Sequence, residues 1–308
     1  MKIAVIGAGG MGGYYGGVLA QRNHEVTFIA RGAHLRALQQ DGLQVRSVFG
    51  DFMVKPARAT DHPAGVGPVE LMLFCTKSYD TDEAAELALP MIGAETSILS
   101  LQNGVDAAER IGRLAGMEHM LAGATWISSA VEGPGTIKQA SDFRRVVIGE
   151  LSGKITPRVR GVQEAFSGTG VAIEISKNIQ GVLWAKFIFI AAASAFGSLT
   201  RLPVGGFRAV PETRAWMTNL MRETEAVARG LGVRLSTDAV EKALAFMDSS
   251  GPNIKASMQL DVEAGRRTEV ESIVGFIGRK GRELGIPTPV ADMLYAVLLP
   301  VELAAQAR

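Results

Sequence analysis

The fold is decided at the start of the chain, where residues 2–21 read KIAVIGAGGMGGYYGGVLAQ. Residues 2–6 are predicted to form a strand, with the apolar run Ile3–Ile6 typical of a buried one, and residues 11–21 have the length and composition of a helix. The glycines between them fit the spacing G-x-G-x-x-G. Between a strand and a helix, this spacing allows a tight turn and brings the phosphates of a dinucleotide to the helix N-terminus. The predicted cofactor loop consists of Gly7, Ala8, Gly9, Gly10, Met11 and Gly12.

Short β-branched runs alternate with amphipathic segments through the first half of the chain. This alternation predicts βαβ units and a parallel sheet. We predict strands at residues 25–30, 71–75, 97–101 and 171–175, and helices at residues 33–40, from 81, 106–114 and 156–166. A hairpin is expected through residues 49–51, and residues 121–150 are β-rich with turns at 133–135.

After residue 176 the apolar period becomes helical and remains so. We predict helices at residues 178–193, 211–231, 238–247, 257–263, 268–284 and 290–305. Length also favours two domains rather than one. The sequence therefore predicts an α/β chain, with a Rossmann-type domain over residues 1–177 and an all-helical domain over residues 178–308.

The bulk properties exclude several function classes. Hydrophobic residues make up 47% of the chain, charged residues 20%, and the net charge is +1, so no charge excess favours nucleic acid or an anionic membrane. The longest apolar stretch, residues 187–199, is shorter than the roughly 20 residues that span a bilayer. No secretory signal precedes the glycine loop, so we expect a cytoplasmic protein. The single cysteine, Cys75, lies in an apolar run and is interpreted as a buried hydrophobe rather than a nucleophile.

The prediction of NADP(H) rather than NAD(H) depends on Arg31. NAD enzymes commonly place an acid at the end of the second strand, where it binds the ribose 2′-hydroxyl. Here the strand ends in the run Thr27-Phe28-Ile29-Ala30-Arg31, which contains no acid. A guanidinium attracts a 2′-phosphate that a carboxylate would repel. NADP(H) is therefore favoured, and the alternative is a solvated loop arginine.

The reduction of a carbonyl needs a proton donor as well as a hydride. The four histidines fall in turns or at helix ends, where a surface position is the simplest interpretation. Lys186 instead lies within the apolar segment Trp184–Ile190. Its ammonium either reaches outward to water or is held in a cleft, where desolvation would lower its pKa.

Other polar residues follow predicted strands or begin a helix. Lys77 and Asn103 each follow a buried strand, at the carboxyl edge where open α/β sheets bind ligands, although Asn103-Gly104 also suits a simple turn. Glu269 begins a late helix and is available to a ligand. Thr268 and Glu271 have the spacing of a capping box, which gives Glu271 a structural explanation. We predict no metal site.

Together these residues resemble the ketopantoate reductase (2-dehydropantoate 2-reductase) family over essentially the whole chain. The matching motifs are FIARG (28–32), TKSYD (76–80), LQNG (101–104), WAK (184–186), SM (257–258) with Asp261, TE (268–269) and GIP (285–287). The resemblance implies a Rossmann domain followed by a helical domain similar to that of 6-phosphogluconate dehydrogenase. It also implies that NADPH reduces the C2 carbonyl of ketopantoate, which yields pantoate for pantothenate and coenzyme A synthesis.

The resemblance also assigns roles to single residues. Lys186 matches the general acid, and Asn103 matches a residue that contacts both cofactor and substrate. Ser257 would bind the substrate carboxylate, and Glu269 would contact the cofactor or help to order the closed site. Two further cofactor contacts are implied, Lys77 near the nicotinamide and Ala130.

One departure from the family leaves the substrate open. The family commonly carries asparagines four and eight residues after the lysine, where this chain has Ile190 and Ser194. An isoleucine cannot hydrogen-bond a substrate oxygen, and losing such a partner shifts specificity. Two alternatives to ketopantoate reduction therefore stay open: a reductase of another branched 2-oxo acid, and a non-catalytic NADPH-binding redox sensor. The expected partner is a small 2-oxo acid, not nucleic acid or a membrane, and a homodimer remains open.

Overall fold

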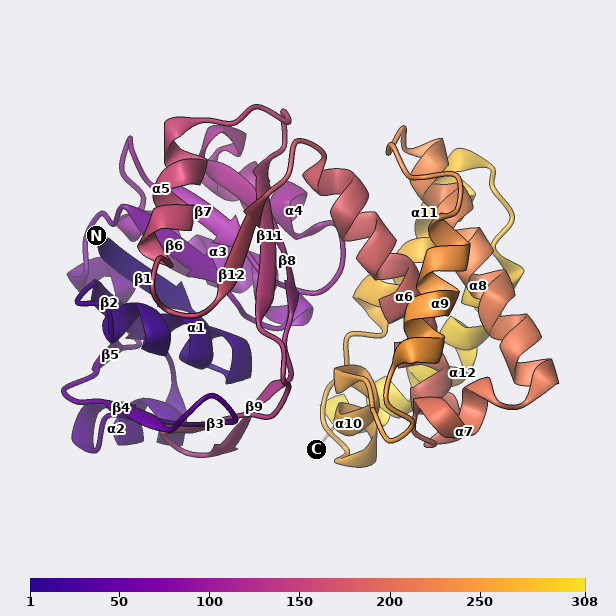
Figure 1. Cartoon of the computed structure of the whole chain (residues 1–308), viewed down its shortest axis with the longest axis horizontal. Helices are drawn as coiled ribbons and strands as arrows, with labels where there is room; N and C mark the ends of the chain where they lie inside the picture. Colours follow the sequence, from indigo (N-terminus) through magenta and orange to yellow (C-terminus); the bar gives the residue numbers. More distant parts are fainter. Residues whose placement is uncertain (308) are drawn as a thin grey trace. The chain divides into compact units, whose positions relative to one another are not determined.

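The computed structural model describes residues 1–307, which divide into two compact units. Unit 1 comprises Met1–Ile179 and unit 2 comprises Gln180–Arg308, with Arg308 itself outside the described residues. The division lies two residues beyond the boundary expected after residue 177. In Figure 1 unit 1 runs from indigo to rose, and unit 2 continues through orange to yellow.

Unit 1 is built on an 8-stranded sheet with the order β12-β11-β8-β7-β6-β1-β2-β5. Its strands are β1 (Lys2–Ile6), β2 (Glu25–Ile29), β5 (Arg58–Thr60), β6 (Leu71–Phe74), β7 (Ser97–Ser100), β8 (Met120–Trp126), β11 (Arg145–Glu150) and β12 (Ala172–Ile175). The chain moves outward from β1 to β2 on one side and continues through β6 and β7 on the other. Ligands bind at such a switch point, outside the carboxyl ends of the strands.

Both faces of this sheet are covered because its strands are apolar on both sides. Ile3 and Val5 of β1 belong to one core cluster, whereas Ala4 and Ile6 belong to another. The covering helices are α1 (Gly10–Ala20), α2 (Gly32–Gln40), α3 (Thr81–Ala88), α4 (Ala107–Ala115) and α5 (Pro157–Ala165). This is the doubly wound arrangement that the sequence predicted.

Two features of unit 1 differ from a purely parallel sheet. Strand β11 pairs antiparallel with β8, because residues 121–150 double back within the β-rich segment. A separate 4-stranded sheet has the order β4-β3-β10-β9 and contains the hairpin expected at residues 49–51. Its strands are β3 (Leu43–Ser47), β4 (Phe52–Val54), β9 (Ser129–Gly133) and β10 (Thr136–Gln139).

Unit 2 is helical. Its helices are α6 (Ile179–Thr200, which begins at the last residue of unit 1), α7 (Val204–Arg208), α8 (Pro211–Gly230), α9 (Ala239–Ser249), α10 (Ser257–Glu263), α11 (Phe276–Leu284) and α12 (Pro289–Gln306). The sequence did not predict α7, and α6 continues to Thr200 rather than ending at residue 193. It continues because Ala195 and Phe196 are buried in the core of unit 2. The helix expected from residue 268 begins instead as a π-helical turn, Glu271–Gly275, in which Gly275 N–H donates to Val270 O.

Among residues 1–307, α6 and α12 are long and apolar enough to cross a membrane by length and composition alone. The 22 residues of α6 exceed the apolar stretch identified from sequence. In its most apolar window 67% of residues are buried within the fold, as in the core helix of a soluble protein. The corresponding share for α12 is 28%.

Candidate active site

The glycine loop joins the end of β1 to the first turn of α1. Gly9 is the N-cap, no side chain caps the helix, and its first turn carries no acidic residue. The first N–H groups of a helix lack intrahelical partners and carry partial positive charge, so this turn offers donors to a phosphate. A Cβ on Gly12 would lie 2.1 Å from Gly7 O, which explains why the strand and helix require glycine there.

Strand β9 lies directly against this loop. A Cβ on Gly10 would come within 2.5 Å of Ser129 O and 2.8 Å of Ala130 Cα. Both contacts are with backbone, which cannot move aside as a flexible side chain would. Ala130, which the family resemblance selected, therefore lies beside the predicted cofactor loop.

Three of the four histidines are less exposed than the sequence predicted. His62 is exposed, whereas His24, His34 and His119 are half-buried and hydrogen-bond to backbone groups. His34 Nε2 lies 2.8 Å from Ala8 O, and Gly135 N–H donates to His34 Nδ1 at 3.1 Å. This pairing suits a neutral ring, and burial lowers the pKa of His34. His34 thus links the glycine loop to the turn between β9 and β10.

Arg31 lies just beyond the carboxyl end of β2, where the sequence placed it. Its side chain is 75% exposed and its Nη2 lies 3.0 Å from the Asp80 carboxylate. An exposed ion pair of this kind contributes at most about 1 kcal/mol. The guanidinium is therefore accessible at the edge where the ribose of a dinucleotide would lie.

Lys77 and Asn103 follow the neighbouring parallel strands β6 and β7, so they share one sheet edge. Both are half-buried. Lys77 precedes the short 3₁₀ turn Ser78–Asp80, and Asn103 precedes Gly104, whose φ of 96° permits a sharp turn.

Gln102 connects these two loops, and sequence reasoning missed it. Its side chain is 4% exposed. The amide nitrogen donates to Thr76 O and Thr76 Oγ1, both at 3.1 Å, and to Thr81 Oγ1 at 2.8 Å. Its carbonyl oxygen accepts from Ser100 Oγ at 3.2 Å. A polar residue directly after a buried strand was the available signal, but its partners are remote in sequence.

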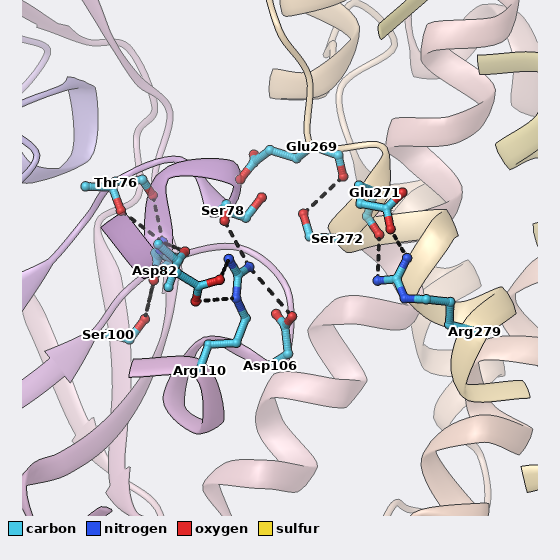
Figure 2. Close-up of polar contacts among 12 residues, drawn as sticks. Thr76, Ser78, Asp82, Ser100, Asp106, Arg110, Glu269, Glu271, Ser272 and Arg279 are labelled. Carbon is cyan, nitrogen blue, oxygen red and sulfur yellow. Dashed lines mark hydrogen bonds and ion pairs between the residues drawn. The ribbon is translucent and has the colours of Figure 1, made fainter. Parts of the chain in front are cut away.

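Arg110 of α4 contacts the residues that follow Lys77 at this sheet edge, as Figure 2 shows. Its guanidinium makes two contacts of 3.1 Å with the Asp82 carboxylate and donates to Ser78 O at 2.9 Å. A weaker contact of 3.8 Å reaches Asp106. The loop that carries Lys77 is thereby tied to α3 and α4.

In unit 2, Lys186 lies in the second turn of α6 and is half-buried. Burial lowers the pKa of Lys186 to about 8, and the negative charge of Glu269 partly opposes this effect. Glu269 is itself only 4% exposed. The structure therefore places two residues from distant parts of unit 2 in electrostatic contact, and gives the lysine an acidity suited to proton transfer near neutral pH.

Ile190 and Ser194 follow Lys186 at intervals of four residues, so the three share one face of α6. Ile190 is half-buried, and Ser194 is 2% exposed. Ser257 is the exposed first residue of α10. Asp261, buried on the same helix, holds Arg266 through contacts of 2.9 and 2.8 Å.

The predicted capping box at Thr268 and Glu271 was wrong. The Thr268 hydroxyl donates to the Glu302 carboxylate at 2.7 Å, and Glu271 pairs with Arg279 and accepts from Tyr295 Oη at 2.5 Å. Figure 2 shows the Glu271–Arg279 pair beside Glu269 and Ser272. A partner 34 residues away replaces the local one, because the buried Glu302 carboxylate requires donors. Glu302, an acid within the mostly apolar second half of α12, was a second signal that sequence reasoning missed.

Within residues 1–307, no group of three or more His, Cys, Asp or Glu side chains is arranged to hold a metal ion. Cys75 packs against the core of unit 1, and burial raises the pKa of its thiol to about 12. A thiol of that pKa is not a nucleophile at neutral pH, in agreement with the sequence interpretation.

Comparison with known proteins covers both units. A family model described as ketopantoate reductase PanE/ApbA matches residues 3–153, and its C-terminal counterpart matches residues 178–302. The uncharacterized oxidoreductase YkpB of Bacillus subtilis is 33% identical over 97% of this chain and 98% of its own length. The 2-dehydropantoate 2-reductase of Halobacterium salinarum is 32% identical over 96% of each chain. The crystal structure of a PanE/ApbA family ketopantoate reductase from Ralstonia eutropha is 34% identical with a TM-score of 0.91, over 99% of this chain and 100% of that one.

Proposed function

The chain belongs to the ketopantoate reductase family, and from this premise we propose that it reduces the 2-oxo group of ketopantoate to pantoate with NADPH. Its class, an oxidoreductase acting on CH–OH groups, follows from the family. The observation that carries the proposal is the half-buried Lys186 ammonium beside the acidic Glu269, on the helical unit that follows a dinucleotide-binding unit. We further propose that the protein acts in the cytoplasm and in pantothenate synthesis.

The nicotinamide, when bound, supplies the hydride to C2 of the substrate. As the new C–H bond forms, the carbonyl π electrons move to the oxygen, and Lys186 Nζ gives that oxygen a proton. The lysine leaves the step neutral and regains its proton from solvent. With a pKa of about 8, the side chain is largely protonated at neutral pH yet acidic enough to donate.

The preference for NADPH is supported by Arg31. Its exposed guanidinium lies after β2, with no carboxylate at the end of that strand. The pairing with Asp80 is weak enough for a 2′-phosphate to replace it. In the same proposal the N-terminus of α1 binds the pyrophosphate, and Lys77, Asn103 and Ala130 contact the cofactor.

On the substrate side, Lys186 and Asn103 would face the reacting carbonyl, and Ser257 would bind the carboxylate. The second candidate function is reduction of another branched 2-oxo acid. It is favoured by Ile190, which leaves an apolar position one turn beyond Lys186, and by the buried Ser194.

NADPH oxidation by the purified protein, measured against a panel of 2-oxo acids that includes ketopantoate, tests the proposal. Ketopantoate should give the highest kcat/KM. A higher value for another branched 2-oxo acid would select the second candidate, and no oxidation with any of them would reject both.

A further inference from the structure

Glu302 is a buried carboxylate in the last turns of α12 and is only 4% exposed. A buried charge is stable only when donors surround it. One oxygen, Oε2, accepts from Thr268 N–H at 2.5 Å and from Thr268 Oγ1 at 2.7 Å. The other accepts from Gln306 Nε2 at 2.7 Å and lies 3.7 Å from Arg267 Nε.

These contacts fix a segment that no regular structure holds. Residues 264–270 connect α10 to the π-helical turn at Glu271–Gly275. A single oxygen of Glu302 holds both the backbone and the side chain of Thr268, and so fixes the position and the rotamer of that residue together. Glu269 follows directly, and its carbonyl accepts from Ile273 N–H at 3.0 Å. The backbone of Glu269 is therefore held on both sides.

The orientation of Glu269 matters because its charge acts on Lys186. The carboxylate opposes the effect of burial and raises the pKa of Lys186 toward its ordinary value. If Glu269 moved away, burial alone would act on the lysine. The fraction of the ammonium present at a given pH would then fall.

We propose that Glu302 is a positioning residue, which keeps the Glu269 carboxylate beside the Lys186 ammonium by holding Thr268. The inference rests on the proposed function for the role of Lys186 in turnover. In this proposal Glu302 acts through Thr268 and Glu269 and contacts neither substrate nor cofactor.

Glu223 provides a matched control, because it is a carboxylate that anchors the opposite end of the same helix. It accepts from Val290 N–H and Ala291 N–H, both at 2.9 Å. Glu223→Gln therefore weakens the attachment of α12 without touching Thr268. It separates a loss of helix anchoring from a loss of Glu269 positioning.

The experiment compares Glu302→Ala, Glu302→Gln, Thr268→Val and Glu223→Gln with the wild type. Two quantities are measured across pH: kcat with ketopantoate, and the ¹³C NMR shift of the lysines after reductive ¹³C-methylation. The Lys186 signal is identified by its loss in Lys186→Arg. The NMR titration requires no turnover, so it remains informative if the substrate assignment fails.

We expect Glu302→Ala to lower the titration midpoint of Lys186 by about 1 unit, the usual effect of losing one nearby opposite charge. The high-pH limb of kcat should move with it, so that turnover at pH 9 falls about tenfold. KM for NADPH should not change. Thr268→Val should lower the Lys186 midpoint as well, but by a smaller amount. Glu302→Gln keeps an oxygen that accepts from Thr268, so its Lys186 midpoint should stay close to that of the wild type.

A lowered Tm with an unmoved Lys186 midpoint in Glu302→Ala and Thr268→Val would overturn the proposal, as would an equal shift in Glu223→Gln. If Glu302→Ala does not fold, Thr268→Val and Glu302→Gln decide the question. If the Lys186 midpoint shifts as expected in the variants while the wild type does not reduce ketopantoate, the positioning role is supported and the proposed substrate is rejected.

Discussion

Apart from the Arg110–Asp82 ion pair of unit 1, the two units hold their candidate residues by different physical means. In unit 1 the loops after β6 and β7 are joined by the neutral amide of Gln102, and a neutral His34 links the glycine loop to a neighbouring turn. In unit 2 charged groups take part: the Glu302 carboxylate holds the segment before Glu269 through the N–H and hydroxyl of Thr268, and the charge of Glu269 acts on Lys186. Neutral hydrogen bonds are nearly indifferent to pH, whereas buried charges titrate. Binding of the cofactor and transfer of the proton should therefore respond differently to pH and to mutation.

The largest expected effect is that of Lys186→Ala. Turnover should fall by roughly 10²–10⁴, because the developing alkoxide loses its general acid. The Kd for NADPH should change little, since the residues proposed to bind its phosphates belong to unit 1. Steady-state kinetics and fluorescence titration of NADPH measure the two quantities.

The wild type adds a pH test of the same role. Only the ammonium form donates, so kcat should decline as pH rises through about 8, the pKa of Lys186. A folded Lys186→Ala protein with near wild-type turnover would remove this lysine from the mechanism.

Arg31→Ala should selectively weaken NADPH. A charge-assisted hydrogen bond to a phosphate contributes about 1.5–3 kcal/mol, so the ratio of the Kd values for NADH and NADPH should fall about tenfold or more. The control is Arg36→Ala, which removes an exposed arginine from α2, the helix that Arg31 precedes. Equal affinities for both cofactors in the wild type would contradict the assignment of Arg31.

Gln102→Ala tests the neutral hydrogen bonds that join the loops after β6 and β7 in unit 1. It leaves the buried Thr81 hydroxyl and the Thr76 carbonyl short of a partner, which should destabilise the fold by about 1–2 kcal/mol and lower Tm by several degrees. The pH dependence of kcat should keep its midpoint, because no charge is lost. Gln39→Ala, which removes an exposed hydrogen bond to Ala59 O, should have little effect on Tm. A shifted midpoint in the pH dependence of kcat of Gln102→Ala would show that the hydrogen bonds of unit 1 also affect proton transfer.

The smallest expected effect concerns substrate choice. Ile190→Asn should raise kcat/KM for ketopantoate about fivefold relative to less polar 2-oxo acids, the worth of roughly one hydrogen bond. Ile190→Leu keeps the position apolar and should preserve the ranking. An unchanged ranking in both variants would show that residue 190 packs within the unit instead of facing the substrate.

Sequence reasoning succeeded where local patterns determine structure. The glycine loop, the alternation of strands and helices, and most helices of unit 2 depend on neighbours within a few turns. The sequence predicted that this helix ends at residue 193, but burial of Ala195 and Phe196 extends α6 to Thr200. Packing energy overrides propensity at such positions.

What sequence could not predict depends on contacts between remote residues. Gln102 joins Thr76 across 26 residues, and Glu302 joins Thr268 across 34. The local spacing of Thr268 and Glu271 suggested a capping box, yet a buried carboxylate elsewhere competed for the threonine. Lys186 could be singled out as a candidate general acid because its apolar setting is contiguous in sequence, whereas the residues proposed to orient Glu269 are not.

The late position of Glu302 has a consequence for biosynthesis. Domains fold as units, the earlier one first, as a chain leaves the ribosome. Unit 1 has its own core and is complete long before Glu302 is translated. A nascent chain should thus gain the fold that receives a dinucleotide while residues 264–270 still lack their anchor, and that anchor arrives only with the last turns of α12.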